Sequence, residues 1–212
     1  MSTRRPASGE ELNEGPETPP RVAASVIVLR DSREGPEVLL VQRNPAARFM
    51  GGAWVFPGGA VHGDESPAEA GLRELEEEAG VSIGAGALVP FSRWITPAEV
   101  KLRFDTFFYA VEAPGGTEPR VDGEECVDVR WLRPADALAA HERGELSLVF
   151  PTIKHLEQLA ATTSVAATIA AAREREVGPI QPRIVVVDGS AQVLLPGEPG
   201  FDDAGPVPGS AA

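Results

Sequence analysis

The sequence predicts a mixed α/β sandwich, and three observations lead to that class. The chain has 212 residues, enough for one sizeable hydrophobic core, so a single domain with tails is expected. Its apolar content of 42% is ordinary for a globular protein. Short β-branched segments are interspersed with segments of helical pattern, and they do not follow the regular βαβ alternation of a fully parallel sheet.

The chain begins with residues 1–20, which are rich in Pro, Glu, Gly and Ser and have no apolar periodicity. Such a composition predicts a disordered tail. The folded domain is therefore expected to span residues 21–175. Its strands are predicted, in chain order, at residues 22–29, 38–41, 54–56, 104–111 and 127–132.

A helix is predicted at residues 66–79, because both of its ends carry capping signals. Ser66 is a favourable N-cap, Pro67 suits the first helical position, and Glu69 completes a capping box. Gly80 stands where a helix-ending glycine belongs. The core face of this helix is expected to be the apolar stripe of Ala68, Leu72, Leu75 and Ala79.

The second half of the domain is expected to contain two more helices. One is predicted at residues 134–143, and a longer one within residues 152–175. A C-terminal extension, residues 176–198, contains two short apolar segments on either side of Asp188-Gly189, a pair typical of hairpin turns, and so predicts a small β-hairpin. Residues 199–212 are expected to form a flexible tail.

Composition and charge argue against several functions. Asp and Glu outnumber Lys and Arg by 32 to 19, which gives a formal net charge of −13. Duplex nucleic acid and anionic membranes both attract clustered basic residues, so neither is an expected partner. The single cysteine, Cys126, allows no intramolecular disulfide and no cysteine metal cluster. The sequence has no signal-peptide pattern and no bilayer-spanning segment, so a cytoplasmic location is expected.

The helix predicted at residues 66–79 carries an acidic face. At roughly 100° per residue, Glu74, Glu77 and Glu78 are neighbours, whereas Glu76 points elsewhere, toward solvent. Three close carboxylates repel one another, and they lie in the C-terminal half of the helix, where its dipole disfavours anions. A divalent cation would relieve that repulsion, and oxygen ligands alone favour Mg²⁺ or Mn²⁺. The alternative is a merely solvated acidic face.

The segment around this helix resembles a known motif. Residues 59–81 match the Nudix box, Gx5Ex7REUxEExGU, in which U is a bulky apolar residue, and every specified position is filled. The resemblance implies a Nudix-type α/β/α sandwich around a mixed β-sheet. It also implies a diphosphatase, in which water attacks one phosphorus of a nucleoside diphosphate linked to another moiety.

The resemblance also implies roles for individual residues. The metal-binding positions are Glu74, Glu77, Glu78 and the carbonyl of Gly59. Arg73 matches the arginine that orients the carboxylates, and Glu65 a supporting acid. The general base is left open: Glu77 and Glu78 are candidates inside the motif, and Glu124 or Glu125, in a loop before a strand, is the alternative.

The preceding residues 39–59 are similar to the coenzyme A pattern LLTxRSx3Rx3Gx3FPGG, with Val41 in place of Thr and Asn44 in place of Ser. Downstream segments look like the branch that contains the peroxisomal coenzyme A diphosphatase; they are residues 93–97, 103–106 and 129–132. Arg43 and Arg48 then become candidate phosphate contacts, with surface arginines as the alternative.

Coenzyme A or acyl-coenzyme A is therefore the first substrate expected, and ADP-ribose or NADH the second. A catalytically silent Nudix module that only binds a nucleotide is a third interpretation, which the intact acidic residues disfavour. The sequence leaves the number of metal ions open. It also leaves the oligomeric state open, with a homodimer as one alternative.

Overall fold

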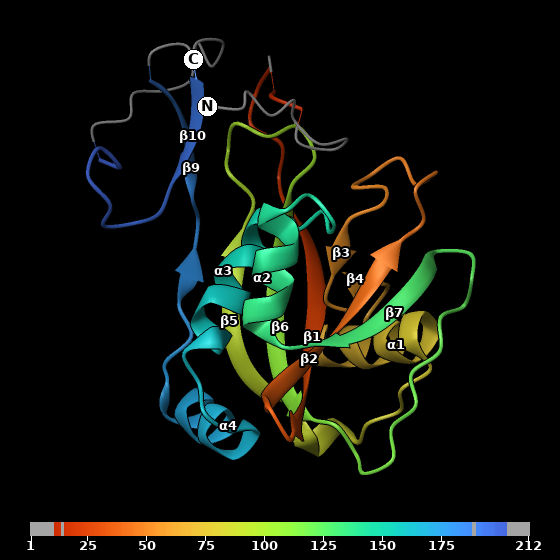
Figure 1. Cartoon of the computed structure of the whole chain (residues 1–212). Helices are drawn as coiled ribbons and strands as arrows, with labels where there is room; N and C mark the ends of the chain where they lie inside the picture. The colour runs from red at the N-terminus through yellow and green to blue at the C-terminus, as the bar shows by residue number, and fades with distance from the viewer. Residues whose placement is uncertain (1–10, 14, 188–189, 203–212) are drawn as a thin grey trace.

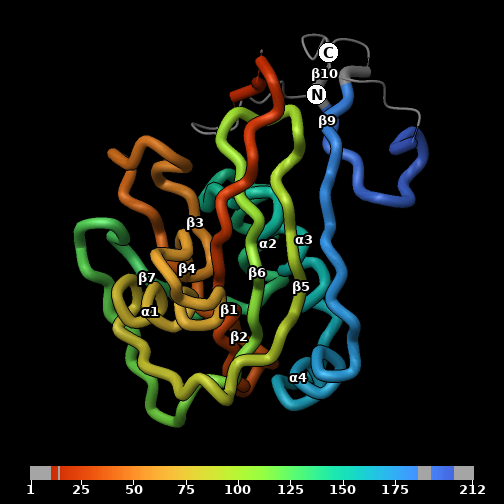
Figure 2. Tube along the Cα trace, turned by 180° about the vertical axis from the view of Figure 1, so that it is seen from behind, coloured from red at the N-terminus to blue at the C-terminus, as the bar shows by residue number. Residues whose placement is uncertain are grey.

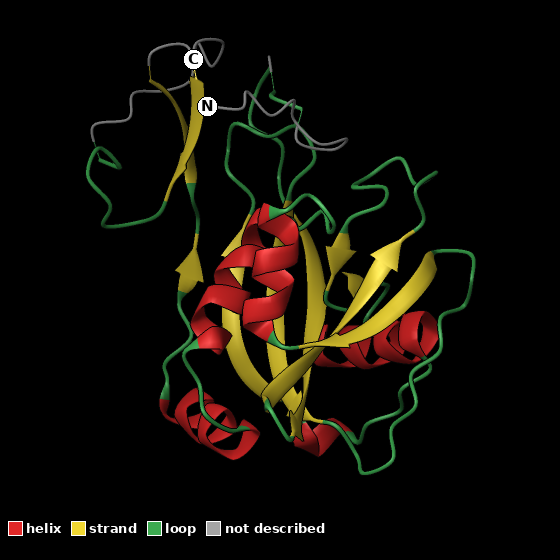
Figure 3. Ribbon diagram, in the orientation of Figure 1, coloured by secondary structure: helices red, strands yellow, loops and turns green. Residues whose placement is uncertain are grey.

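The computed structural model describes residues 11–13, 15–187 and 190–202, which form a mixed sheet with helices on both faces (Figures 1 and 3). The strands of the sheet are β1 (Arg21–Ser32), β2 (Gly35–Arg43), β3 (Trp54–Val55), β4 (Gly58–Ala60), β5 (Val89–Ile95), β6 (Phe104–Glu112), β7 (Cys126–Leu132) and β8 (Pro179–Ile180). Their order is β3-β2-β1-β6-β5-β8, with β4 also paired to β1 and β7 to β2. β1 pairs with β6 and β5 with β8 in parallel, and the other neighbours are antiparallel. The predicted α/β class is confirmed.

The helices form the outer layers. One face of the sheet is covered by α2 (Pro134–Glu142), α3 (Phe150–Ala160) and α4 (Val165–Glu174). The other face packs against α1 (Pro67–Ala79), which lies on its β1 and β4 side (Figure 2). A short 3₁₀ helix, η1 (Ala85–Ala87), follows α1.

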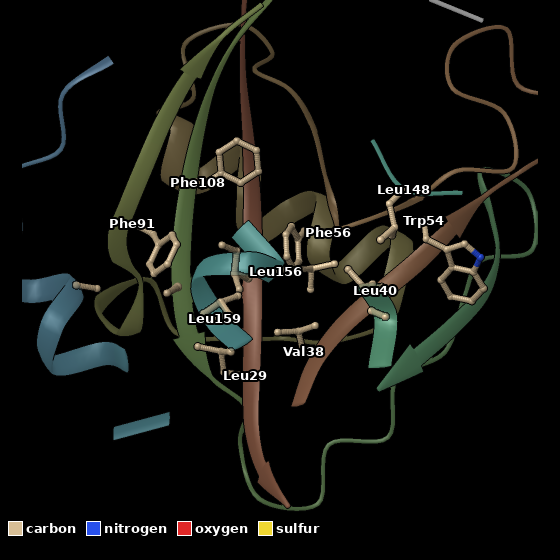
Figure 4. Packing of buried hydrophobic residues seen from close by; sticks show 14 of the residues in the cluster. Leu29, Val38, Leu40, Trp54, Phe56, Phe91, Phe108, Leu148, Leu156 and Leu159 are labelled. Atoms are coloured by element: carbon tan, nitrogen blue, oxygen red, sulfur yellow. The ribbon is translucent and has the colours of Figure 1, made fainter. Parts of the chain in front are cut away.

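β1 separates two hydrophobic clusters by strict alternation of its side chains. Ile27 and Leu29 point into the larger cluster, beneath α2, α3 and α4 (Figure 4). Val26 and Val28 point into the smaller cluster, beneath α1. All four are fully buried. A strand that is apolar on both faces is the pattern that a central, doubly covered strand requires.

The longer helix predicted within residues 152–175 is two helices, so that prediction is wrong. α3 ends at Ala160 and α4 begins at Val165. Ser164 is the N-cap of α4, and its hydroxyl accepts a hydrogen bond from the Ala167 amide. The polar residues before α4 favour caps and turns over helix interiors, which explains the break.

The predicted core face of α1 is only partly correct. Leu75 and Ala79 are fully buried, but Ala68 and Leu72 are only partly buried. Gly71 lies on the buried face instead, where an added Cβ would meet a methyl carbon of Val26 at 3.0 Å. The absence of a side chain at this position allows α1 to pack closely on β1, a contact that helical periodicity alone does not reveal.

The N-terminal segment contacts the loop between β5 and β6. The amide of Asn13 donates to the Glu99 carbonyl at 2.7 Å, and the amide of Lys101 donates to the Glu11 carbonyl at 2.9 Å. The buried Arg103 forms an ion pair with Glu17. The prediction of a disordered tail did not anticipate these contacts for residues 11–20. Its remainder, residues 1–10 and 14, lies outside the described residues.

The C-terminal extension contains the hairpin β9 (Arg183–Val187) and β10 (Ser190–Leu194), which are antiparallel and form a separate two-stranded sheet. A hairpin was predicted here; its turn residues, 188 and 189, and residues 203–212 lie outside the described residues. Within the described part of the chain, no helix has the length and apolar character needed to cross a membrane.

Candidate functional site

The predicted caps are present at both ends of α1. The Ser66 hydroxyl accepts from the Glu69 amide at 3.3 Å, and the Glu69 carboxylate accepts from the Ser66 amide at 2.7 Å. At the other end Gly80 adopts a left-handed conformation, with φ of 63°. The Arg120 amide then donates to the carbonyl of Ala79 at 2.8 Å, so the loop before β7 meets the C-terminus of α1. The helix ends are therefore held both by local caps and by a distant loop.

Arg73 connects three of the predicted acidic residues. Its Nη1 donates to Glu74 Oε1 at 2.8 Å and to Glu77 Oε2 at 3.0 Å. Its Nη2 donates to Glu65 Oε1 at 2.8 Å and to the Ala60 carbonyl at 3.1 Å. The hydrogen bond from Arg73 is the largest cause that lowers the pKa of Glu65, to about 2. One guanidinium thus links the segment before α1 to the acidic side chains on it.

Gly59 and Glu74 are packed directly against each other. Glu74 is only 8% exposed. A Cβ atom added to Gly59 would lie 2.3 Å from Glu74 Oε1, so Glu74 would have to move to admit any larger residue. Only glycine allows the backbone of β4 to approach this carboxylate so closely.

Glu78 is the most deeply buried of the acidic residues on α1, with 2% of its surface exposed. Its Oε2 accepts a hydrogen bond from the Gly58 amide at 2.9 Å. Burial raises the pKa of Glu78 to about 7; the Gly58 amide opposes the shift, the charge of Glu74 adds to it, and Arg43 opposes it. Burial and the nearby Glu78 raise the pKa of the Cys126 thiol above its usual range.

The structure does not place the three glutamates on one open face. Glu74 and Glu78 are turned inward, whereas the Glu77 side chain is 59% exposed. Glu76 is also exposed, as predicted, and accepts a hydrogen bond from the Ser82 hydroxyl. As the side chains stand, no three His, Cys, Asp or Glu residues in the described ranges are grouped so as to hold a metal ion.

The two arginines of the predicted substrate site lie on different elements, Arg43 on β2 and Arg48 in the loop after it. Arg43 ends β2, donates from Nε to the Phe49 carbonyl at 3.2 Å, and lies close enough to Glu78 to lower its pKa. Arg48 is exposed in the loop between β2 and β3. The structure therefore places Arg43 near the buried carboxylate of Glu78.

The loop that carries Glu124 and Glu125 is hydrogen-bonded to the residue that follows β2. Both side chains are exposed. Asn44, directly after β2, donates from its amide to the Glu125 carbonyl and from its side chain to the Glu124 carbonyl, each at 2.8 Å. The Asp122 carboxylate accepts from the amides of Glu125 and Cys126 at 2.8 and 2.9 Å. Asp122 was not among the predicted site residues, and its contacts are local to this loop. The proximity of Cys126 to Glu78 had no signal in the sequence, because it depends on how β7 pairs with β2.

A hollow of about 260 Å³ lies elsewhere, between α3, α4 and β5, and is lined in part by Phe91, Gln158, Thr168 and Arg175. It contains none of the predicted site residues and lies on the opposite face of the sheet from α1. The chemistry indicated by the sequence is therefore centred on α1, β4 and the start of β7.

The chain is similar to known proteins over most of its length. A NUDIX domain model matches residues 19–150. A Mycobacterium tuberculosis protein provisionally named 8-oxo-dGTP diphosphatase 3 is 30% identical over 192 residues, which cover 89% of this chain and 82% of that protein. A Caenorhabditis elegans protein provisionally named nudix hydrolase 7 is 27% identical over 183 residues; the match covers 66% of this chain and 60% of the worm protein. The crystal structure of a NUDIX hydrolase from Alicyclobacillus acidocaldarius has a TM-score of 0.66 at 27% identity, covering 72% of this chain and 96% of that one.

Proposed function

This chain belongs to the Nudix family, and from that premise we propose that it hydrolyses the diphosphate linkage of a nucleoside diphosphate joined to a second moiety. One observation carries the proposal. Two carboxylates of α1, Glu74 and Glu78, are buried against the backbone of Gly58 and Gly59 in the segment that matches the family's motif. Two buried negative charges close together lower the stability of the fold, and such a loss of stability is expected at functional sites.

The donors at this place suit the divalent cation that Nudix hydrolases generally use. Every side-chain donor is a carboxylate oxygen, which favours Mg²⁺ or Mn²⁺ over softer metals. The ligands would be Glu74, Glu77, Glu78 and the carbonyl of Gly59, whose missing side chain leaves the space that Glu74 occupies. When bound, such a cation neutralises the charge of a diphosphate and lowers the pKa of the attacking water.

The remaining residues orient these groups and accept a proton. Arg73 holds Glu74 and Glu77 through one nitrogen, and Glu65 fixes Arg73 in turn. Proton transfer from the water requires a carboxylate within reach. Glu77 and Glu78 lie on α1, and Glu124 or Glu125 is the alternative, because the loop that carries them leads directly into Cys126, which lies near Glu78.

A catalytically silent module is the second candidate, and the acidic residues argue against it. A protein that only binds a nucleotide has no need of two buried carboxylates, whose burial opposes binding of an anion. Turnover of any nucleotide substrate in the presence of Mg²⁺ or Mn²⁺, lost on chelation, would exclude that alternative.

We propose coenzyme A or acyl-coenzyme A as the substrate class. The proposal rests on the pattern in residues 39–59 and on the position of Arg43, a cation beside the buried Glu78. ADP-ribose and NADH are the alternatives, and the name of the mycobacterial relative adds 8-oxo-dGTP.

The experiment is a panel of these compounds with Mg²⁺ or Mn²⁺, with the products identified by mass. Cleavage of coenzyme A between its two phosphates gives adenosine 3′,5′-bisphosphate and 4′-phosphopantetheine. The Glu78→Gln variant, assayed in parallel, measures the contribution of contaminating phosphatases. Turnover of ADP-ribose or 8-oxo-dGTP without turnover of coenzyme A would exclude coenzyme A and leave the diphosphatase proposal standing.

A substitution tests how coenzyme A would be recognised. Coenzyme A carries a 3′-phosphate that ADP-ribose and NADH lack, and the exposed Arg48 is a candidate partner for it. Because a charge-assisted hydrogen bond contributes ~1.5–3 kcal/mol, Arg48→Ala should lower kcat/KM on coenzyme A roughly ten- to a hundredfold. The loss on 3′-dephospho-coenzyme A should be smaller. Equal losses on both substrates would show that Arg48 has another role.

A further inference from the structure

β7 lies at an edge of the sheet, with a second strand on one side only (Figure 1). Within the described residues its one strand partner is β2. The outer side of β7 therefore presents backbone N–H and C=O groups to which a further strand can pair. β7 has seven residues and no proline, so two common features that block such pairing, short length and proline, are missing.

The hydrogen bonds of β2 show which of its residues are directed at β7. The amide of Arg43 donates to the Ala53 carbonyl at 2.9 Å, and its carbonyl accepts from the Gly52 amide at 3.1 Å, so the backbone of Arg43 faces the β3 side. Successive residues of an antiparallel strand turn their backbone groups to opposite sides. The backbone groups of Leu40 and Gln42 are therefore directed at β7.

The residues of β7 that lie opposite these two are Arg130 and Asp128. Their backbone groups face β2, and those of Val129 and Trp131 face the free edge. One hydrogen bond agrees with this assignment. The Val129 amide donates to Oδ1 of Asp128 at 2.8 Å, which would not be needed if that amide were paired with β2.

The side chains on either side of Val129 carry opposite charges. Asp128 and Arg130 form an ion pair at 2.7 Å, and their side chains are 39% and 52% exposed. If a second β7 pairs antiparallel with Val129 opposite its own copy, Asp128 comes opposite the partner's Arg130, and Arg130 opposite the partner's Asp128. Both contacts then join opposite charges, which stabilises cross-strand pairs. Centring the pair on Asp128 or on Arg130 would set like charges opposite each other.

We propose that the free edge of β7 is the interface of a homodimer, in which two copies pair antiparallel about Val129 and continue the sheet across a two-fold axis. The two Val129 residues exchange both of their backbone hydrogen bonds, and the carboxylate of Asp128 turns from the Val129 amide to the partner's Arg130. The exposed Val127 then lies opposite the partner's Trp131. A surface that is complementary to itself is what a two-fold dimer requires. The inference is independent of the proposed function.

Reversal of single charges tests the interface. Asp128→Arg leaves two positive charges on the edge, and Arg130→Asp leaves two negative charges. Each should raise the dissociation constant of the dimer about tenfold or more, because both cross-strand contacts become repulsive. The double variant Asp128→Arg/Arg130→Asp exchanges the charges and should remain within about threefold of the wild type. An equimolar mixture of the two single variants should form a heterodimer.

Sedimentation equilibrium from about 1 to about 200 µM protein measures these constants, with thermal melting of each variant. Glu157→Arg is the matched control, because it makes the same change of charge at an exposed position of α3. It should leave the dissociation constant unchanged. Hydrogen exchange of the wild type is a second measurement that needs no substitution. Exchange of the Val129 and Trp131 amides should slow as the protein concentration rises, while that of α4 should not change.

Three results would overturn the inference. The first is a wild-type protein that stays monomeric up to about 200 µM. The second is a dimer that neither Asp128→Arg nor Arg130→Asp weakens, which would place the interface elsewhere. The third is a double variant that is folded but dimerises as weakly as the single variants, which would exclude pairing about Val129. None of these results bears on the proposed hydrolysis, which is measured separately.

Discussion

Glu78 and Glu74 are buried at positions of α1 that would stabilise the fold more if they were apolar. Desolvation of a carboxylate is costly, and the charge of Glu74 adds to the cost of ionising Glu78. The raised pKa of Glu78 follows mainly from this burial. The neighbouring Glu76, by contrast, is exposed and can be changed without these effects.

Glu78→Gln and Glu77→Gln should each lower kcat about a hundred- to a thousandfold, because electrostatic groups of this kind contribute ~2–4 kcal/mol to lowering the barrier. The melting temperature of Glu78→Gln should not fall, since the substitution removes a buried like charge. Glu76→Gln is the control on the same helix and should have nearly wild-type kcat. Steady-state rates and melting curves of the three variants provide the comparison. A large loss of rate in Glu76→Gln would show that the proposed assignment of the acidic residues is wrong.

Gly59→Ala should abolish most of the activity while leaving a folded protein. The added Cβ would lie 2.3 Å from Glu74 Oε1, so Glu74 must move away from β4. Gly84→Ala is the control, since a Cβ there meets nothing within 4 Å and the φ of Gly84 is −68°. The comparison needs kcat, Mn²⁺ affinity and circular dichroism of both variants. Wild-type Mn²⁺ affinity in Gly59→Ala would remove Glu74 from the proposed site.

The elements of the fold differ in how far they could be predicted from the sequence. The caps of α1 are local and were predicted, whereas the predicted common face of Glu74, Glu77 and Glu78 is not found, because Glu77 is exposed and the other two are buried. β5 was not predicted as a strand, because Pro90 interrupts its apolar pattern; the register with β6 shifts there. The inward turn of Glu78 depends on how α1 packs on the sheet, and its proximity to Cys126 depends on the pairing of β7 with β2; no local pattern specifies either.

α3 is attached to β5 by a buried histidine. His155 is 2% exposed, and its Nε2 lies 2.6 Å from the Ser92 hydroxyl. Its ring contacts four aromatic side chains, with the Phe108 ring closest at 4.3 Å between centroids. Burial lowers the pKa of His155 to about 3, the nearby Arg175 lowers it further, and the Pro151 carbonyl opposes the shift. The folded protein therefore keeps this imidazole neutral.

Protonation of His155 should destabilise the fold below about pH 6.5. The unfolded chain binds a proton below that pH and the folded chain does not, so the stability present above pH 6.5 is lost as the pH falls toward 3. Between pH 7 and pH 5, the free energy of unfolding of the wild type should fall by ~2 kcal/mol more than that of His155→Gln, which cannot titrate. Urea unfolding at pH 7, 6 and 5 measures the difference. Parallel pH profiles would show that His155 is not responsible.

The net charge of the whole molecule has the same sign as the proposed substrate and therefore repels it. A net charge of −13 repels a nucleotide at long range, while Arg43 and a bound cation act only nearby. Raising NaCl from about 20 to about 200 mM at constant Mg²⁺ should therefore raise kcat/KM by ~two- to fivefold, with kcat unchanged. Rates at low and at saturating substrate separate the two constants. A steady fall in kcat/KM with salt would mean that local cations dominate the approach of the substrate.

β1 acquires its neighbours at very different times during synthesis. The hairpin with β2 closes through a tight turn, with Ser32 opposite Gly35, as soon as both strands have left the ribosome. The parallel partner of β1, β6, follows only after β5 and the whole of α1, and closure of so long a loop is slow. In that interval one edge of β1, which is apolar from Val26 to Leu29, is open to other nascent chains. Aggregation during expression should therefore depend on translation speed between residues 43 and 112 and on the supply of chaperones, even if the finished protein is stable.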